Sequence, residues 1–324
     1  MKRRNKAFAA LVLFLGAMIV LVTVLMIRES GTTDKPSQIH VIIDNSSDNR
    51  WVQFIAGMQQ AAEDQGVNLI VMPTGKLEGL SEQESLIERA ISEGTDGVII
   101  QLFASTDAAS TLESLSSRTD IEIVDEDDYE VMSNVVGVVS PDHNAVGETI
   151  AGEVITFAGK PLEECSIGVI KGSSALSSSE ERLTGFTQAL ESAGGKIAWI
   201  VYPDDEEKSI KDLLTGYPVP DVLVALDNAG MEAAGEYAAA QEKDITVIGT
   251  GTSMKSIYYL DSGVAESLVV TEDYMMGYQS VTDLAEYIHR NRFLPQVRTV
   301  LHRVVHRDTL FAEENQEILF PVQR

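Results

Sequence analysis

Short apolar segments alternate with amphipathic segments along most of this 324-residue chain. The apolar segments are rich in Ile and Val, which is typical of parallel strands buried on both faces. The segments between them carry apolar residues three or four positions apart, the spacing of helices. This alternation predicts an α/β fold with parallel sheets. The expected strands are 39–43, 69–72, 97–100, 121–124, 167–170, 197–201, 222–226, 245–248 and 265–270.

The alternation runs once up to about residue 140 and then starts again, which predicts two lobes with a cleft between them. In open parallel sheets, ligands bind beyond the carboxyl ends of the strands. The loops that follow the expected strands are therefore the candidate binding segments. They are 44–51, 101–106, 125–129, 171–180, 202–206, 227–229 and 249–253.

The N-terminus carries a different pattern. Four basic residues within positions 1–6 precede an uncharged apolar run at 7–27. About 20 apolar residues span a bilayer, and the run is longer than the apolar part of a cleaved signal, with no small-residue cleavage site after it. We expect a cytoplasmic tip (1–6), a transmembrane helix (7–27), a linker (28–37) and an extracytoplasmic domain. A removed signal peptide is the alternative, and a lipid anchor is disfavoured because no Cys lies near the run.

The formal net charge of −26 argues against nucleic acid and anionic membrane surfaces as partners of the domain. An acidic surface that keeps the protein soluble is the simpler explanation of this charge. The single cysteine, Cys165, excludes an intrachain disulfide. Its apolar surroundings in the sequence favour a core residue over a nucleophile.

No motif of a known catalytic class occurs in the chain: P-loop, HExxH, GxSxG and CxxC are all absent. The glycines at 249 and 251 are more consistent with a tight turn than with a phosphate loop. His302 and His306 have a spacing that could chelate a metal on a helix, but no Cys accompanies them. The sequence therefore predicts no catalytic residue, no metal site and no cofactor, with a hydrolase on the same fold as the alternative.

Six segments, in order along the chain, resemble the ribose-type periplasmic (solute) binding proteins, which share their fold with the ligand-binding core of the Lac repressor family. The segment GTDGVII and the segment ERLTGF are two of them. The resemblance implies a type I periplasmic binding protein fold, with two Rossmann-like lobes joined by three crossovers. The first lobe would be 38–140 plus 272–292, and the second 141–271 plus 293–324. The matching segments are 48–62, 94–100, 140–147, 181–186, 247–249 and 274–278.

The resemblance also implies where a ligand binds. The family's ligand-binding positions fall on Asp48, Arg50, Trp51, Asp127, Glu180, Asp227 and Thr271. Several differ from the residues usual for sugars, although an aromatic ring can still stack on a sugar from Trp51. A core position is the alternative for Trp51. The acids at 48, 127 and 180 favour a positively charged ligand such as an amino sugar or polyamine, unless they merely line the rim of the cleft.

Together these features predict a binding protein that closes around a small polar ligand, with a carbohydrate as the leading candidate, and makes or breaks no bond. The resemblance implies a membrane partner that recognises the closed form, either an ABC-type importer or a sensor histidine kinase. A fixed anchor favours sensing, since an anchored receptor need not shuttle its solute. A transcription regulator is disfavoured, because the chain has a membrane span and no DNA-binding domain.

Overall fold

The computed structural model describes residues 18, 35–46, 51–105, 108–126, 135–203, 208–290 and 296–320. The chain forms two compact units, Met1–Pro36 and Ser37–Arg324, and the α/β fold belongs to the second. The expected transmembrane run at 7–27 lies outside the described residues, except for Met18. Among the residues that are described, no helix combines the length and apolar character needed to cross a membrane.

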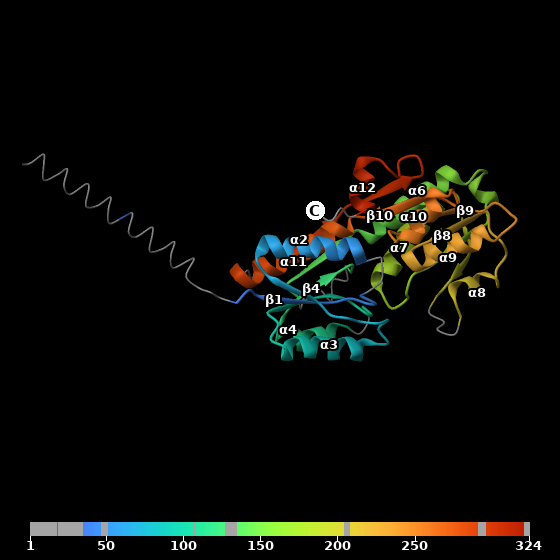
Figure 1. Ribbon diagram of the computed structural model, residues 1–324. Coiled ribbons are helices and arrows are strands. Elements are labelled where there is room, and N and C mark those ends of the chain that lie inside the picture. Colours follow the sequence, from blue (N-terminus) through green and yellow to red (C-terminus); the bar gives the residue numbers. More distant parts are fainter. Residues whose placement is uncertain are drawn as a thin grey trace, which may run out of the picture. The chain divides into compact units, whose positions relative to one another are not determined.

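The described residues form two six-stranded sheets, and the first has the order β11-β5-β4-β3-β1-β2, with parallel neighbours throughout. Its strands are β1 (Gln38–Ile42), β2 (Asn68–Val71), β3 (Gly97–Gln101), β4 (Asp120–Val124), β5 (Gly137–Pro141) and β11 (Gln296–Val300). Helices α2 (Val52–Gln65) and α11 (Asp273–Arg290) cover one face, and α3 (Leu80–Ser92) and α4 (Ala108–Ser116) cover the other (Figure 1).

The second sheet has the order β12-β10-β9-β8-β6-β7, parallel except that β12 runs antiparallel to β10. Its strands are β6 (Ile167–Ile170), β7 (Ile197–Val201), β8 (Val222–Ala225), β9 (Thr246–Thr250), β10 (Ala265–Thr271) and β12 (His302–His306). One face of this sheet packs on α6 (His143–Phe157) and α7 (Ser177–Ser192). The opposite face packs on α8 (Ile210–Leu214), α9 (Asn228–Ala239) and α10 (Met254–Asp261). A 3₁₀ turn η2 (Leu162–Glu164) precedes β6, and α12 (Glu313–Leu319) follows β12. The expected two-lobed α/β fold with parallel sheets is confirmed.

The chain passes between the sheets three times: after β5, after β10, and between β11 and β12. The third passage is where the structure differs from the expected lobe limits. We expected 293–324 in the second lobe, whereas β11 pairs with β5 in the first sheet and, of these two strands, only β12 joins the second. The apolar pattern of a strand does not say which sheet edge it will join, so this placement depends on tertiary pairing. The other expected lobe limits stay a prediction.

Two pairs of helices approach each other through glycines. A Cβ added to Gly147 of α6 would lie 2.1 Å from the carbonyl oxygen of Arg182, and one on Gly185 of α7 would lie 2.1 Å from that of Asn144. Gly57 of α2 and Gly277 of α11 make the same reciprocal contact in the first lobe. Contacts this short exclude any side chain, so these glycines are required for the spacing of α6–α7 and of α2–α11.

Candidate functional site

A cavity of about 260 Å³ lies where the carboxyl ends of the strands of both sheets meet. Gln101, Thr250 and Thr271 are the last residues of β3, β9 and β10, and each of them lines it. The sequence predicted a site at these strand ends, and this prediction is consistent with the observed position of the cavity. The charged lining residues are Asp44, Lys76, Asp125, Arg182, Asp227 and Asp273.

Trp51 forms part of the wall on the side of the first lobe. Its side chain is only 5% exposed, its ring lies 5.4 Å from that of Phe54, and it belongs to the core under α2. The indole Nε1 donates a hydrogen bond to the carbonyl oxygen of Asp44, at 2.8 Å. Trp51 therefore occupies a core position and a cavity position at once, so the two interpretations of its role do not exclude each other.

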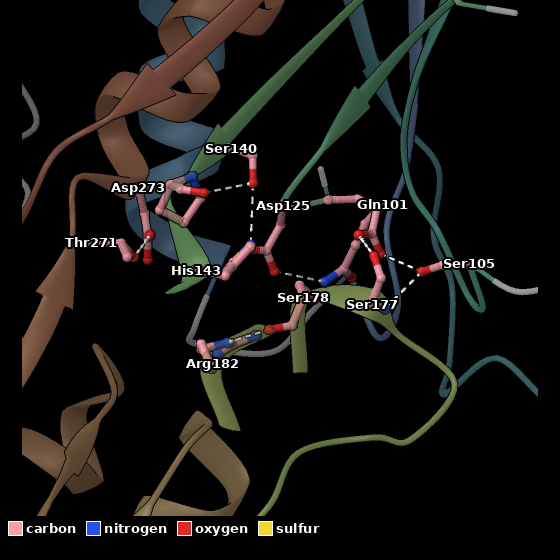
Figure 2. A network of polar contacts seen from close by, with 12 residues as sticks. Gln101, Ser105, Asp125, Ser140, His143, Ser177, Ser178, Arg182, Thr271 and Asp273 are labelled. Carbon is pink, nitrogen blue, oxygen red and sulfur yellow. Dashed lines mark hydrogen bonds and ion pairs between the residues drawn. The ribbon is translucent and has the colours of Figure 1, made fainter. Parts of the chain in front are cut away.

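Asp125, directly after β4, lies at the centre of a polar network (Figure 2). Its carboxylate accepts a hydrogen bond from Gln101 Nε2, at 3.4 Å, and lies 3.5 Å from Nε2 of His143. Its φ of 60° is in the left-handed region, which is costly for a residue with a side chain. Such strain in a cavity wall is typical of functional positions.

His143 begins α6 and is almost fully buried beside Ser140, whose Oγ lies 3.1 Å from Nε2 (Figure 2). Burial lowers the pKa of His143 well below its usual range, and the nearby Arg182 charge acts in the same direction. A hydrogen bond involving Asp125 opposes this shift. The imidazole is therefore neutral at pH 7, and its contact with Asp125 is a polar contact between a neutral ring and a carboxylate.

Arg182 brings a positive charge into the cavity from the first turns of α7. Its Nη1 donates to the carbonyl oxygen of Leu226, at 2.8 Å, and its Nε to that of Ser178, at 3.3 Å. These bonds hold the guanidinium in place beside the ends of β8 and α7. From the sequence we expected a ligand-binding residue at Glu180 instead, although Arg182 stands in the matched segment ERLTGF.

Asp273 lies at the start of α11, at the second passage between the sheets. Its carboxylate accepts hydrogen bonds from Thr271 Oγ1, at 2.5 Å, and from Thr252 Oγ1, at 3.0 Å. Burial raises the pKa of Asp273 to about 6, and the Asp125 charge adds to this effect. The two threonine hydroxyls and Arg182 oppose the rise without cancelling it. The carboxyl group of Asp125, which faces the same cavity, thus destabilises the ionised form of Asp273.

The structure places three of the expected ligand-binding residues, Trp51, Asp227 and Thr271, in the cavity wall. One oxygen of Asp227 caps α9 by accepting from the Gly230 amide, at 2.6 Å. Glu180 is absent from the cavity lining and forms an ion pair with the buried Lys171, with its own side chain 56% exposed. The remaining three, Asp48, Arg50 and Asp127, lie outside the described residues.

Sequence reasoning missed several lining residues as individuals, namely Asp44, Gln101, Asp125, His143, Arg182 and Asp273. Three of them, Asp44, Gln101 and Asp125, fall in the loops selected because they follow strands, so position after a strand was the usable signal. His143 and Asp273 begin helices at the passages between the sheets. These two residues reach the cavity only because the chain passes from one sheet to the other at the start of each helix.

The arrangement provides hydrogen-bond donors and acceptors for a small polar molecule. Among the described residues, no group of three or more His, Cys, Asp or Glu could hold a metal ion. His302 and His306 lie on strand β12, where they contact different residues of α6: Thr149 Oγ1, at 2.9 Å, and Glu153 Oε2, at 2.7 Å. Both are thus engaged with the protein itself.

Comparison with solved structures shows the same fold in several solute-binding proteins. One is a carbohydrate transporter solute-binding protein of Agrobacterium radiobacter in complex with D-arabinose, with TM-score 0.78 and 19% identity over 89% of this chain and 100% of that chain. A glucose-galactose binding protein of Geobacillus stearothermophilus, GanP, has TM-score 0.76 and 19% identity, covering 86% of this chain and 100% of its own. At such identities the likeness concerns the fold alone.

Curated proteins and family models also match. Periplasmic protein TorT of Escherichia coli K12 is 26% identical over 195 residues, which is 58% of this chain and 55% of that protein. The chain spans about half the length of the curated relatives it matches. The model of the periplasmic binding protein domain matches residues 39–291, well over half of the chain. This family and the structural neighbours are solute-binding proteins, not enzymes. The chain belongs to the periplasmic binding protein family.

Proposed function

We propose that this protein is an extracytoplasmic receptor that closes its two lobes around a small polar solute, a carbohydrate or amino sugar. The observation that carries the proposal is the cavity between the strand ends, which both lobes line with charged and hydrogen-bonding groups. Its volume of about 260 Å³ is slightly below the roughly 300–1,000 Å³ of typical ligand pockets. A cavity of this size suits a single sugar ring better than an oligosaccharide or a peptide.

The structural neighbours support a sugar as the ligand class. Crystal structures of solute-binding proteins with this fold contain bound D-arabinose, α-D-tagatopyranose or D-fucose. In this chain Trp51 offers an apolar wall, while carboxylate and amide groups such as Asp125 and Gln101 offer hydrogen bonds to neighbouring hydroxyls.

The charge of the lining favours a neutral or cationic sugar over an anionic one. Among the residues that the structure describes, four aspartates face the cavity against two cationic side chains, those of Lys76 and Arg182. These aspartates support the proposal of an acidic lining, whereas Glu180 is paired with Lys171. An amine on the ligand near Asp125 and Asp273 would offset the repulsion between those carboxyl groups.

Calorimetry on the full chain in detergent tests the ligand class. We expect binding to at least one of D-arabinose, D-tagatose, D-fucose and D-glucosamine, and none to D-glucuronate, whose carboxylate the acidic lining repels. Trp51→Ala should weaken binding by about 1–3 kcal/mol through the lost aromatic contact. Trp199→Ala is the matched control, because Trp199 stacks on Tyr217 and does not line the cavity.

Saturating ligand at 100 times its dissociation constant should also stabilise the folded protein by about 2.7 kcal/mol. Absence of binding to all four sugars, or equal losses for Trp51→Ala and Trp199→Ala, would contradict this assignment.

We infer further that residues 7–27 anchor the receptor in the cell membrane, with the basic tip inside and the ligand-binding lobes outside. The closed form would then be recognised by a membrane partner, either an ABC-type importer or a sensor histidine kinase. An anchored receptor favours the kinase, because binding can be reported without releasing the solute. The ligand shifts the equilibrium to the closed form only by its differential affinity for that form.

A further inference from the structure

A second polar cluster joins the two lobes beside the cavity, and its residues are Ser105, Glu126, Ala175 and Ser177. Figure 2 labels Ser105 and Ser177 of this cluster. Ser105 and Glu126 follow strands β3 and β4 of the first sheet. In the second lobe, Ala175 lies in the loop before α7, and Ser177 is the first residue of α7. The amide of Ser105 donates to the carbonyl oxygen of Ala175, at 2.8 Å. The amide of Ser177 donates to Ser105 Oγ, at 3.0 Å.

The carboxylate of Glu126 is the centre of this cluster. It accepts a hydrogen bond from Ser105 Oγ on one oxygen and from Ser177 Oγ on the other. Glu126 is only 2% exposed and Ser105 only 5%. Hydrogen bonds that are shielded from water are costly to break when their partners stay buried. One of the two crosses from the first lobe to the second, so separation of the lobes would break it.

The cluster is coupled to the cavity through its neighbours in the chain. Asp125, directly before Glu126, faces the cavity, while Glu126 is not among the cavity-lining residues. On the other side, Ser177 begins α7, and the same helix carries Ser179 and Arg182 into the cavity wall. Contact between Glu126 and Ser177 therefore fixes the first turn of α7 opposite Asp125.

We propose that Glu126 is a positioning residue that latches the two lobes together, with Ser105 and Ser177 as its partners. The latch holds Arg182 and Ser179 opposite Asp125 and sets the fraction of the protein that is closed before any ligand arrives. Because only the closed form has a complete cavity wall, the apparent dissociation constant is the intrinsic one divided by that fraction. The latch residues therefore set the apparent dissociation constant for the solute without contacting it.

The test measures the distance between the lobes without any ligand. Spin labels are placed on cysteines introduced at Glu113 of α4 and Lys211 of α8, both exposed, in a full-length background with Cys165→Ala. Pulsed electron resonance then reports the populations of short and long distances. For Ser177→Ala we expect the ratio of closed to open protein to fall about tenfold, which corresponds to about 1.4 kcal/mol.

The matched control is Ser192→Ala, because Ser192 lies in the last turn of the same helix and bonds within it, to the carbonyl oxygen of Gln188. It should leave the distances unchanged. Ser177→Thr keeps the hydroxyl and should restore the parent distribution. Glu126→Gln should open the lobes too, and combining it with Ser177→Ala should add little, because both changes remove the same interaction.

A parent-like distance distribution for Ser177→Ala would overturn the latch, as would full additivity with Glu126→Gln. If Glu126→Gln does not fold, the three serine variants decide the question alone. The experiment contains no solute, so its failure leaves the proposed ligand class standing. Failure of every sugar to bind would conversely leave the latch standing.

Discussion

At the scale of single residues, the site is defined by charged groups that share one small cavity. Asp125, Asp273 and Arg182 come from three separate elements, yet the pKa of Asp273 responds to both of the others. The neutral His143 lies among them and adds a polar group without adding charge. The protein thus holds carboxyl groups in a site that is shielded from water, which costs folding free energy. A ligand that binds these groups can offset that cost.

Asp273 leads to a prediction about pH. Its pKa is raised from 3.8 to about 6, so between these values the folded protein holds a proton that the unfolded chain releases. The free energy of unfolding therefore falls as pH rises through this window and is level above it. Asp273→Asn removes the cost of ionisation and should gain about 1–3 kcal/mol relative to the parent between pH 4 and pH 7.

Urea unfolding of both proteins across this pH range measures the difference. Asp261→Asn is the control, since Asp261 is exposed at the end of α10. A constant difference between the Asp273 variant and the parent from pH 4 to pH 7 would show that Asp273 ionises normally.

At the scale of elements, helices α6 and α7 form part of the cavity wall in the second lobe. α6 presents His143 and Val146 to the cavity, and α7 presents Ser179 and Arg182. Their relative position depends on the mutual approach of Gly147 and Gly185, which leaves no room for a side chain. Close helix packing and site geometry are therefore linked in the second lobe.

Gly147→Ala tests this link, with Gly152→Ala in the same helix as its control. A methyl group at 147 would meet the backbone of α7, so the helices must separate, and we expect about 1–3 kcal/mol of destabilisation. No atom lies within 4 Å of a Cβ at 152, where alanine should stabilise by about 0.5–1 kcal/mol. Thermal unfolding of the two variants gives both values, and changes of equal sign would refute the packing argument.

At the scale of the whole molecule, the chain combines a domain of two lobes with an apolar run that precedes it in the sequence. The lobes are joined by three passages of the chain, the third between β11 and β12. This arrangement permits the hinge-like closure on which both the proposed function and the latch depend.

The membrane anchor is tested on the full chain by cell fractionation. We expect the protein to stay with the membrane after an alkaline carbonate wash, because a helix of about 20 apolar residues inserts through the hydrophobic effect and not through charge. Replacing Leu13 and Val20 with Glu should release it, while replacing Thr32 and Thr33 in the expected linker should not. A mature N-terminus at residue 28 or later would instead identify a removed signal peptide.

The sequence by itself determined the architecture of the domain. Apolar runs of strand length alternate with helical periodicity, and burial on both faces requires that pattern in a parallel sheet. Strands 97–100 and 167–170, for example, were expected and appear as β3 and β6 with every residue buried. Because ligands gather at the carboxyl ends of such strands, the candidate loops followed from the same pattern, and Asp44, Gln101 and Asp125 lie in them.

Tertiary structure alone decided which side chains meet. Arg182 and Glu180 are two positions apart on α7, which turns them toward different sides of the helix, so one reaches the cavity and the other pairs with Lys171. Strand β11 pairs with β5 at the edge of the first sheet, a choice of edge that the apolar pattern of the strand does not specify. His143 and Asp273 reach the cavity because the chain crosses between lobes at those points. Local periodicity specifies elements, whereas contacts between distant segments depend on how those elements pack.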